Sequence, residues 1–163
     1  MIFVTVGAQM PFDRLVRAVD HWASQRRHDD VFAQVGATHA PPTYITWARF
    51  LDPDAFRAKV RTADVIVAHA GIGAILTAME FRRPILVLPR RADLGETRND
   101  HQFATMRQFA EQGIVNVAYD EAELLHQLDK MDTFIIPPPL PPRASRELIS
   151  AVRAFIGDEP SSP

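Results

Sequence analysis

The chain has 163 residues, of which 47% are hydrophobic and 23% charged, and its 18 basic and 20 acidic residues give a formal net charge of −2. This length fits one domain, or two at the most, and the apolar content excludes a mainly disordered chain. The charge balance argues against a general nucleic-acid binder, so no nucleic-acid partner is expected, and the lack of cysteine excludes disulfides and cysteine-ligated zinc.

Short apolar runs alternate with longer amphipathic stretches along most of the chain. In chain order, the pattern predicts strand 2–6, helix 12–23, strand 31–35, strand 44–47, helix 53–62, strand 65–68, helix 74–81, strand 85–88, helix 103–110, strand 114–117 and helix 121–128. Asp52 and Pro53 are typical of the first positions of a helix, and Pro84 and Gly113 of positions just beyond one.

The C-terminal part has a different composition. Residues 137–142 include five prolines, which cannot form a helix or an inner strand and predict a stiff extended spacer. We therefore expect a folded domain over residues 1–135, a proline-rich spacer over 136–142, and a C-terminal helix with a frayed end over 143–163. The apolar face of that helix either docks on a partner or packs back onto its own domain.

Strands and helices in alternation predict an α/β fold, with a Rossmann-like parallel sheet and helices on both faces. Ligands of such sheets bind at the carboxyl ends of the strands, near a switch in strand order. The informative residues should therefore come directly after the strands, and three groups do.

Two of these groups are turns of small residues. They comprise Gly7, Ala8 and Gln9 after the first strand, and Gly71, Ile72, Gly73 and Ala74 after strand 65–68. The first turn lets a ligand approach the backbone, and the second offers free amide groups and a helix dipole to a diphosphate. The second is neither a dinucleotide fingerprint nor a P-loop, and both turns could instead serve only tight geometry or helix–strand packing.

The third group is a polar loop after strand 85–88. It gathers guanidinium, carboxylate, amide and imidazole groups on Arg90, Arg91, Glu96, Asn99, Asp100, His101 and Gln102. Such a mixture can bind sugar hydroxyls and phosphate charge together, although many loops of this polarity are only solvated. His69, before the glycine turn, is a candidate for catalysis or a structural histidine. No metal-ligand spacing surrounds His101, so no metal site is expected.

Together the three groups resemble the C-terminal-domain family of glycosyltransferase family 28. Residues 3–7 and 12–15 look like the N-terminal signature of the eukaryotic catalytic subunit that adds the second GlcNAc in asparagine-linked glycosylation. Residues 63–73 look like its glycine motif and residues 99–102 like its later His-Gln motif, whereas residues 89–102 are most similar to bacterial exopolysaccharide and capsule subunits. The resemblance covers residues 1 to about 130.

One position departs from the family pattern. The eukaryotic subunit and the two-domain relatives carry a glutamate seven residues before the proline that ends the glycine-motif helix, and in the two-domain enzymes it holds the ribose. Counting back from Pro84, this position is Thr77, and Glu80 lies one helical turn later. The resemblance therefore leaves the ribose contact unassigned.

The resemblance implies one half of a two-domain GT-B glycosyltransferase. This half binds the sugar nucleotide, and a membrane-anchored partner subunit supplies the acceptor side. The implied reaction is the inverting transfer of a sugar from a UDP-sugar to a polyprenyl-diphosphate-linked sugar in exopolysaccharide synthesis, with no metal or other cofactor. Glucuronate or galactose is favoured over GlcNAc as the transferred sugar.

The resemblance also implies roles for single residues. The amides around Gly71 and Gly73, assisted by Arg90 or Arg91, would hold the diphosphate, and one of these arginines would pair with a glucuronate carboxylate. The side chains that would orient the sugar are those of Asp100, His101 and Gln102, and Asp100 and His101 are, like His69, also candidates for catalysis. The general base is unassigned and belongs to the acceptor side, on the partner.

Two other functions stay open at this point. The first is a non-catalytic regulatory subunit that binds a nucleotide sugar, which the missing glutamate at Thr77 favours. The second is an unrelated doubly wound enzyme that works without a partner. The N-terminal residues show no secretory signal, and no run approaches the roughly 20 apolar residues of a membrane helix. We expect a cytoplasmic protein, held at the inner face of the membrane through its partner.

Overall fold

The computed structural model describes residues 1–8, 10–98, 101–140 and 150. Its elements are β1 (Ile2–Thr5), α1 (Asp13–Arg26), β2 (Val31–Gln34), β3 (Thr46–Ala48), α2 (Pro53–Thr62), β4 (Val65–His69), α3 (Ile72–Glu80), β5 (Ile85–Leu88), α4 (His101–Glu111), β6 (Asn116–Val117), α5 (Glu121–Leu128) and the short 3-10 helix η1 (Met131–Thr133). Each strand and helix expected up to residue 128 is present, which confirms the predicted α/β class.

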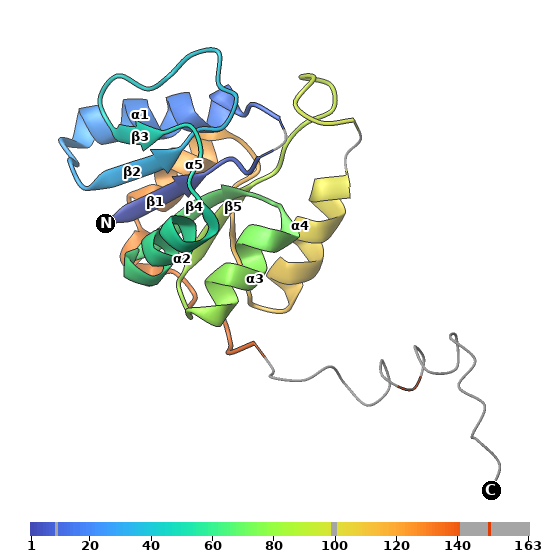
Figure 1. Cartoon of the computed structure of the whole chain (residues 1–163). Coiled ribbons are helices and arrows are strands. Elements are labelled where there is room, and N and C mark those ends of the chain that lie inside the picture. The colour runs from blue at the N-terminus through green and yellow to red at the C-terminus, as the bar shows by residue number, and fades with distance from the viewer. Residues whose placement is uncertain (9, 99–100, 141–149, 151–163) are drawn as a thin grey trace, which may run out of the picture.

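The strands form one six-stranded sheet in the order β3-β2-β1-β4-β5-β6, and every neighbouring pair is parallel (Figure 1). Ile2 of β1 lies opposite Val31 of β2 on one side and Val65 of β4 on the other. The chain therefore builds the sheet outward from β1 in both directions. The strand order switches between the neighbouring strands β1 and β4. Both strands end at the same edge of the sheet, here called the carboxyl edge.

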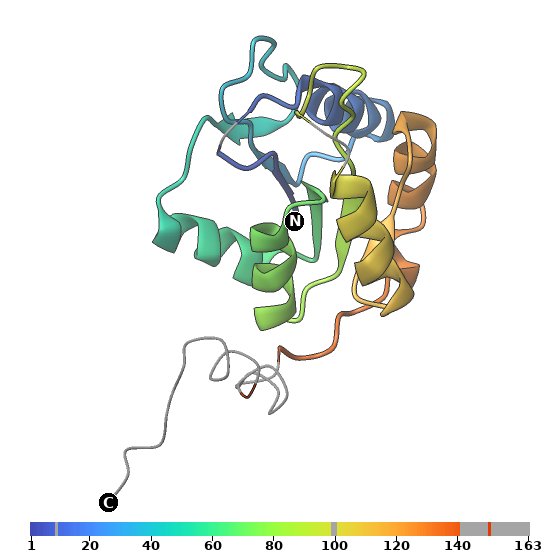
Figure 2. The ribbon, with the colours of Figure 1, turned by 90° about the vertical axis from the view of Figure 1, so that its right-hand side faces the viewer.

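Helices cover both faces of the sheet (Figures 1 and 2). On one face α1 and α5 pack against the strands through residues such as Leu15 and Leu124, and on the other face α2, α3 and α4 do so through Val60, Ile75 and Met106. All five are buried, as are all four residues of β1 and of β5. Burial on both faces explains why these strands are continuous apolar runs.

Local sequence sets the start of two helices. The Asp52 carboxylate accepts a hydrogen bond of 2.8 Å from the Ala55 N–H and caps α2, as expected, and Asp120, which was not predicted as a cap, caps α5 through the Glu123 N–H at 2.8 Å. Helix α3 begins earlier than expected, directly after Gly71. Gly73 is therefore the second residue of the helix rather than part of the turn before it.

The region after η1 is only partly described. Residues 134–140 form neither helix nor strand, in keeping with the proline content. The end of the predicted spacer and all but one residue of the predicted C-terminal helix lie outside the described residues. Within the part of the chain that the structure describes, no helix combines the length and the apolar character needed to cross a membrane.

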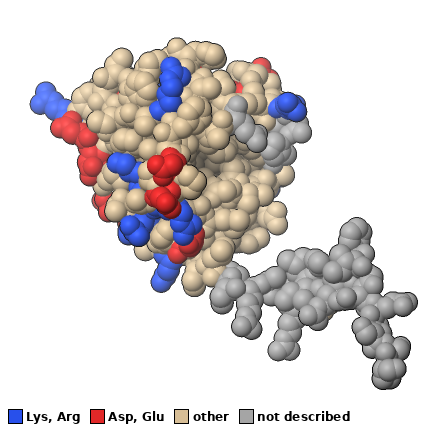
Figure 3. Space-filling model, in the orientation of Figure 1, with Lys and Arg blue, Asp and Glu red and all other residues tan. Residues whose placement is uncertain are grey.

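The charged side chains are unevenly spread over the face seen in Figure 1. Figure 3 shows them gathered over α2 and the adjoining part of α3, where Arg57 and Glu80 form an ion pair. The surface between α3 and the loop after β5 carries few of them (Figure 3). That surface lies at the carboxyl edge, where ligands of parallel sheets bind.

Candidate functional site

A cleft of about 650 Å³ lies at the carboxyl edge, over the switch in strand order. Its floor is formed by the last residues of three strands, Thr5 of β1, Gln34 of β2 and His69 of β4. Its remaining lining residues are Gly7, Ala8, Phe56, Ala70, Gly71, Ile72, Gly73, Ala74, Thr77, Gln102 and Thr105. The cleft thus joins both small-residue turns of the sequence with Gln102 of the polar loop.

The start of α3 offers unpaired backbone donors to this cleft. Gly71 is the N-cap and has no side chain to cap the helix, and the N–H groups of Ile72, Gly73 and Ala74 have no acceptor among the described residues. A Cβ atom added at Gly73 would meet no atom within 4 Å apart from the backbone of its own helix and its chain neighbours. Free amides, the helix dipole and open space at one helix start favour an anionic ligand there.

The His69 imidazole is held between two glycines. A Cβ atom at Gly71 would lie 2.2 Å from His69 Nε2, and one at Gly7 would lie 2.8 Å from His69 Cε1. Gly7 also has a φ of +76°, a conformation that side chains disfavour. Gly7 and Gly71 thus leave room for the imidazole and also line the cleft, whereas the space at Gly73 is open to a ligand.

His69 is neutral at physiological pH. Burial lowers its pKa to about 4, the nearby positive charge of Arg90 acts in the same direction, and a hydrogen bond with the Thr5 backbone opposes them. Its Nδ1 atom is buried and has no hydrogen-bond partner among the described residues. A neutral imidazole in the cleft wall can exchange hydrogen bonds with a ligand without adding charge.

Neither candidate for the missing ribose contact offers a free carboxylate to the cleft. Thr77 lines the cleft, but its hydroxyl donates a 2.8 Å hydrogen bond to the Gly73 carbonyl. Glu80 accepts from both terminal nitrogens of Arg57 on the surface and is absent from the cleft lining. Glu80 thus does not replace the glutamate of the family pattern.

A second, smaller cavity of about 140 Å³ adjoins the cleft. The two share Gly7, Ala8, His69 and Gln102 in their walls, and the smaller one is completed by Val6, Met10, Arg90, Glu96 and Thr97. The Gln102 side chain is fixed between them, because its Oε1 accepts a 3.1 Å hydrogen bond from the Arg90 N–H. The small cavity therefore brings together the loops after β1 and β5.

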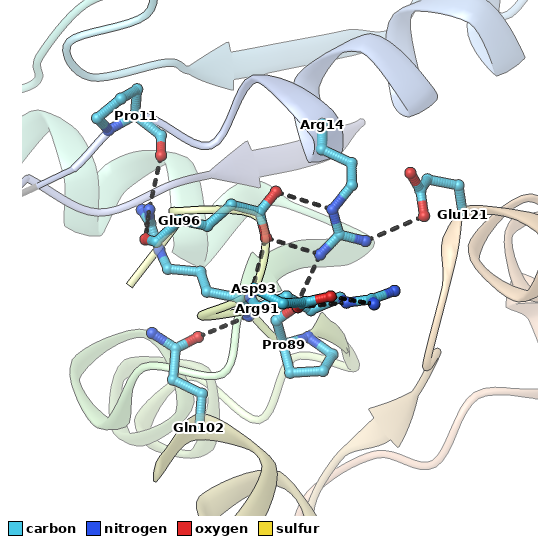
Figure 4. Close-up of polar contacts among 9 residues, drawn as sticks. Pro11, Arg14, Pro89, Arg91, Asp93, Glu96, Gln102 and Glu121 are labelled. Atoms are coloured by element: carbon cyan, nitrogen blue, oxygen red, sulfur yellow. Dashed lines mark hydrogen bonds and ion pairs between the residues drawn. The ribbon is translucent and has the colours of Figure 1, made fainter. Parts of the chain in front are cut away.

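The polar loop is bound to the protein body by a buried ion pair (Figure 4). Arg14 of α1 donates to both carboxylate oxygens of Glu96, at 2.8 and 2.9 Å, and also to Glu121 and to the Pro89 carbonyl, each at 3.0 Å. The side chains of Arg14 and Glu96 are only 9% and 12% exposed. Glu96, expected to bind substrate, holds its own loop against α1 and also lines a cavity beside the cleft, so its predicted role stays a prediction.

The two arginines of the loop differ from the expectation. Arg90 is 4% exposed, and its two terminal nitrogens donate four hydrogen bonds to backbone carbonyls. Arg91 is exposed, and its Nε and one terminal nitrogen bind Asp93 at 3.0 and 2.6 Å. For Arg90 the predicted free guanidinium fork is not present, because backbone carbonyls fill it, whereas the Arg91 fork is held by an exposed pair with Asp93 and its predicted role stays a prediction.

Several predicted site residues lie outside the described part of the chain, and the cleft contains residues that were not predicted. Gln9, Asn99 and Asp100 lie outside the described residues, as does the side chain of His101. Sequence reasoning missed Gln34 and Phe56, which line the cleft. Gln34 has a recognisable signal, since it is the only polar residue of the strand Val31–Gln34 and stands at its carboxyl end. Among the described residues, no three His, Asp or Glu side chains are grouped to hold a metal ion.

Sequence comparisons place this site in a known family. A family model for the glycosyltransferase family 28 C-terminal domain matches residues 1–140. The human protein "UDP-N-acetylglucosamine transferase subunit ALG13" is 27% identical over 122 residues, which are 69% of this chain and 10% of that protein. The mouse protein of the same name is 31% identical over 121 residues, 68% of this chain and 10% of that protein. This chain thus spans about a tenth of the length of these relatives.

Solved structures share the fold. The NMR structure of ALG13 matches with a TM-score of 0.59 and 19% identity, over 96% of this chain and 95% of that one. MurG from Acinetobacter baumannii matches with a TM-score of 0.57 and 19% identity, over 78% of this chain and 40% of that one. At these identities the likeness shows the fold alone, and it confirms the predicted equivalence to the C-terminal half of GT-B glycosyltransferases.

Proposed function

Because the chain belongs to the glycosyltransferase family 28 C-terminal domain family, we propose that it is the donor-binding subunit of a glycosyltransferase and binds a UDP-sugar in the cleft at the carboxyl edge. The observation that carries this proposal is the open start of α3, where three N–H groups without acceptors meet the cleft beside Gly73. These amides would bind the diphosphate of the donor.

In the proposed reaction, an acceptor hydroxyl oxygen attacks the anomeric carbon of the donor sugar and inverts it, while the hydroxyl proton passes to a general base on the partner chain. The bond between that carbon and the UDP oxygen breaks, and UDP leaves with the bonding electron pair. The negative charge that develops on the diphosphate would be stabilised by the amides of Ile72, Gly73 and Ala74, which are already oriented before the reaction. His69, a neutral imidazole beside these amides, would help to position the donor through hydrogen bonds and would add no charge of its own.

The acceptor side is proposed to come from a partner chain. The cleft supplies one wall, and in the proposed GT-B arrangement the second wall and the general base belong to a membrane-anchored subunit. The acceptor would be a polyprenyl-diphosphate-linked sugar at the cytoplasmic face of the membrane, in exopolysaccharide synthesis. Two relatives are named as transferase subunits, which supports a multi-chain enzyme.

The proposed donor is a UDP-sugar whose sugar is to be chosen by experiment. The carboxylate argument for glucuronate no longer applies to Arg90, whose terminal nitrogens are bound to backbone carbonyls, and it now depends on Arg91, whose exposed pair with Asp93 would have to open. The relatives bear the name of a UDP-N-acetylglucosamine transferase, so UDP-GlcNAc joins UDP-glucuronate and UDP-galactose as a donor to test.

Thr77 favours a second candidate, a regulatory subunit that binds a nucleotide sugar without turning it over. Its hydroxyl is engaged with the Gly73 carbonyl, so it supplies no carboxylate for a ribose. A sugar-transfer assay with the purified chain and its membrane-anchored partner distinguishes the two functions. Transfer to a lipid-linked acceptor supports the transferase, whereas binding of the donor without any transfer supports the regulatory subunit.

The Gly73→Val substitution tests the site itself. We expect the variant to fold, because a Cβ atom there meets nothing within 4 Å, and to bind UDP about 100-fold more weakly, a loss of about 2.7 kcal/mol. Calorimetric titration with UDP measures the affinity, and the unfolding midpoint checks the fold. A folded variant with the affinity of the wild type would contradict the proposed site.

A further inference from the structure

One buried side chain joins the two loops that frame the small cavity. Arg90 follows β5, yet its terminal nitrogens reach the loop after β1, where the carbonyls of Val6, Met10 and Pro11 accept hydrogen bonds of 2.7 Å each. A fourth bond, of 3.1 Å, goes to the Glu96 carbonyl in its own loop. No ion pair of Arg90 occurs among the described residues, so carbonyl oxygens take the place of a carboxylate.

Arg90 is itself held from several sides. The Phe12 ring is completely buried, with the Arg90 guanidinium 4.8 Å and the Arg14 guanidinium 5.2 Å from its centroid. Arg14 in turn binds Glu96, whose carbonyl accepts from Arg90. We call these four residues, Phe12, Arg14, Arg90 and Glu96, the arginine clasp. They come from the sequence segments 12–15 and 89–102, which interlock in the fold.

The clasp fixes a cavity that differs from the main cleft in size and chemistry. At about 140 Å³ it is smaller than the roughly 300 Å³ at which typical ligand pockets begin, whereas the main cleft is about 650 Å³. His69 and Gln102 stand in both walls, so a ligand in the cleft can extend into the small cavity. A nucleotide fits only the cleft, and the small cavity is suited to a single polar ring.

We propose that Arg90 is a positioning residue that shapes the small cavity for the sugar moiety of the donor, without itself binding the diphosphate. This inference rests on the proposed function, and it assigns the uridine and diphosphate to the main cleft. Replacing Arg90 would then let the loops after β1 and β5 move apart. The sugar would lose its contacts, while the amides of α3 and the cleft floor would stay in place.

The test compares binding of UDP with binding of UDP-sugars by the full-length chain. Arg90→Lys keeps the charge but cannot reach four carbonyls, and Arg26→Lys serves as its control, since Arg26 pairs with Asp129 at the far end of α1. Each protein is titrated calorimetrically with UDP, UDP-GlcNAc, UDP-glucuronate and UDP-galactose. The readout is the ratio of the UDP-sugar affinity to the UDP affinity.

We expect the wild type and Arg26→Lys to bind one UDP-sugar more tightly than UDP, and Arg90→Lys to lose most of that preference while its UDP affinity changes less than about twofold. An unchanged ratio in folded Arg90→Lys, or a parallel loss for UDP and UDP-sugar, would overturn the inference. A wild-type chain that binds no UDP would instead refute the proposed function.

Hydrogen exchange of the wild type covers the case in which Arg90→Lys does not fold. If the inference is correct, the preferred UDP-sugar slows amide exchange at residues 6–8 and 90–97 more than UDP does. Equal protection by UDP and by the UDP-sugar in both loops would overturn it, because the sugar would then lie elsewhere.

Discussion

The turn after β4 and the loop after β5 lie side by side at the carboxyl edge, yet they treat their polar groups in opposite ways. In the turn, the N–H groups of Ile72, Gly73 and Ala74 have no acceptor among the described residues. In the loop, backbone carbonyls fill the Arg90 fork, and the Arg91 side chain is paired with Asp93 at the surface. The arginine side chains, which look better suited than backbone amides to bind an anionic ligand, thus already have partners within the protein.

This difference indicates that the groups that bind the ligand are not the same as the groups that hold the site in shape. Backbone amides at a helix start cost little to leave open, because water or an anion can occupy them. A buried guanidinium without partners would be expensive, so the clasp satisfies its arginines internally. We therefore infer that the turn after β4 binds the ligand, whereas the loop after β5 maintains the shape of the site. The following substitutions test this division of roles.

The largest expected effect comes from breaking the clasp. Arg14→Ala leaves the Glu96 carboxylate, 12% exposed, with the Arg91 N–H but without its cationic partner, and should lower the free energy of unfolding by about 3 kcal/mol. Denaturant unfolding measures this loss. Arg26→Ala is the matched control, because Arg26 is on the same helix and also binds a carboxylate, but it is exposed and should leave the midpoint nearly unchanged. Equal losses in the two variants would contradict a special role of the clasp.

The second effect is a pH dependence that originates at His69. Its folded pKa of about 4 lies below the ordinary value of 6.5, so the unfolded chain takes up a proton in this range and the folded chain does not. The stabilisation is complete above pH 6.5 and is lost as the pH falls toward 4, by up to about 3 kcal/mol.

The His69→Gln variant isolates this contribution from that of the carboxylates. Unfolding free energies of both proteins at pH 7 and pH 4.5 should show a steeper fall for the wild type. Parallel curves would mean that the imidazole is not held in its neutral form.

A third pair of variants separates the two glycines of the turn. Gly71→Ala places a Cβ atom 2.2 Å from His69 Nε2 and should destabilise the fold by about 1–3 kcal/mol. Gly73→Ala should be neutral or stabilising by up to about 1 kcal/mol, because alanine favours the helix, and yet it should weaken UDP binding. Thermal unfolding and calorimetry together check both. A Gly73→Ala variant as unstable as Gly71→Ala would contradict the inference that only Gly71 is required for packing.

The smallest effect is expected at Arg91. Arg91→Gln removes only an exposed pair with Asp93, so the unfolding midpoint and the UDP affinity should stay at their wild-type values. Calorimetry of this variant beside Arg90→Lys checks the assignment. A marked loss of UDP affinity would show that Arg91 exchanges Asp93 for the diphosphate, which would move ligand binding back to the loop.

The fold was predictable from the sequence because its signals are local. Asp52 with Pro53 marks the start of α2, and the apolar run Ile85–Leu88 marks β5, both with the bounds observed. Helix α3 starts two residues before the expected position, since the glycine at its second position weakened the helical signal.

The site was predictable only in part, because partners distant in sequence decide it. The residues of the glycine turn do line the cleft, but Arg14 and Glu96 are 82 positions apart, and no local pattern reveals that they pair. The order Arg90, Arg91 likewise does not say which side chain turns inward. Gln34 and Phe56 reach the cleft through the strand order and the placement of α2, which the sequence left open.

An NMR titration of the full-length, ¹⁵N-labelled chain with UDP tests most directly whether the nucleotide binds at the start of α3. If it does, the largest amide shift changes occur at Ile72, Gly73 and Ala74, with smaller changes at residues 90–96. Gly73→Val should move these changes to about 100-fold higher UDP concentrations while the rest of the spectrum is retained. Largest changes in the loop after β5, or no changes at the start of α3, would contradict the claim that the nucleotide binds at this helix start.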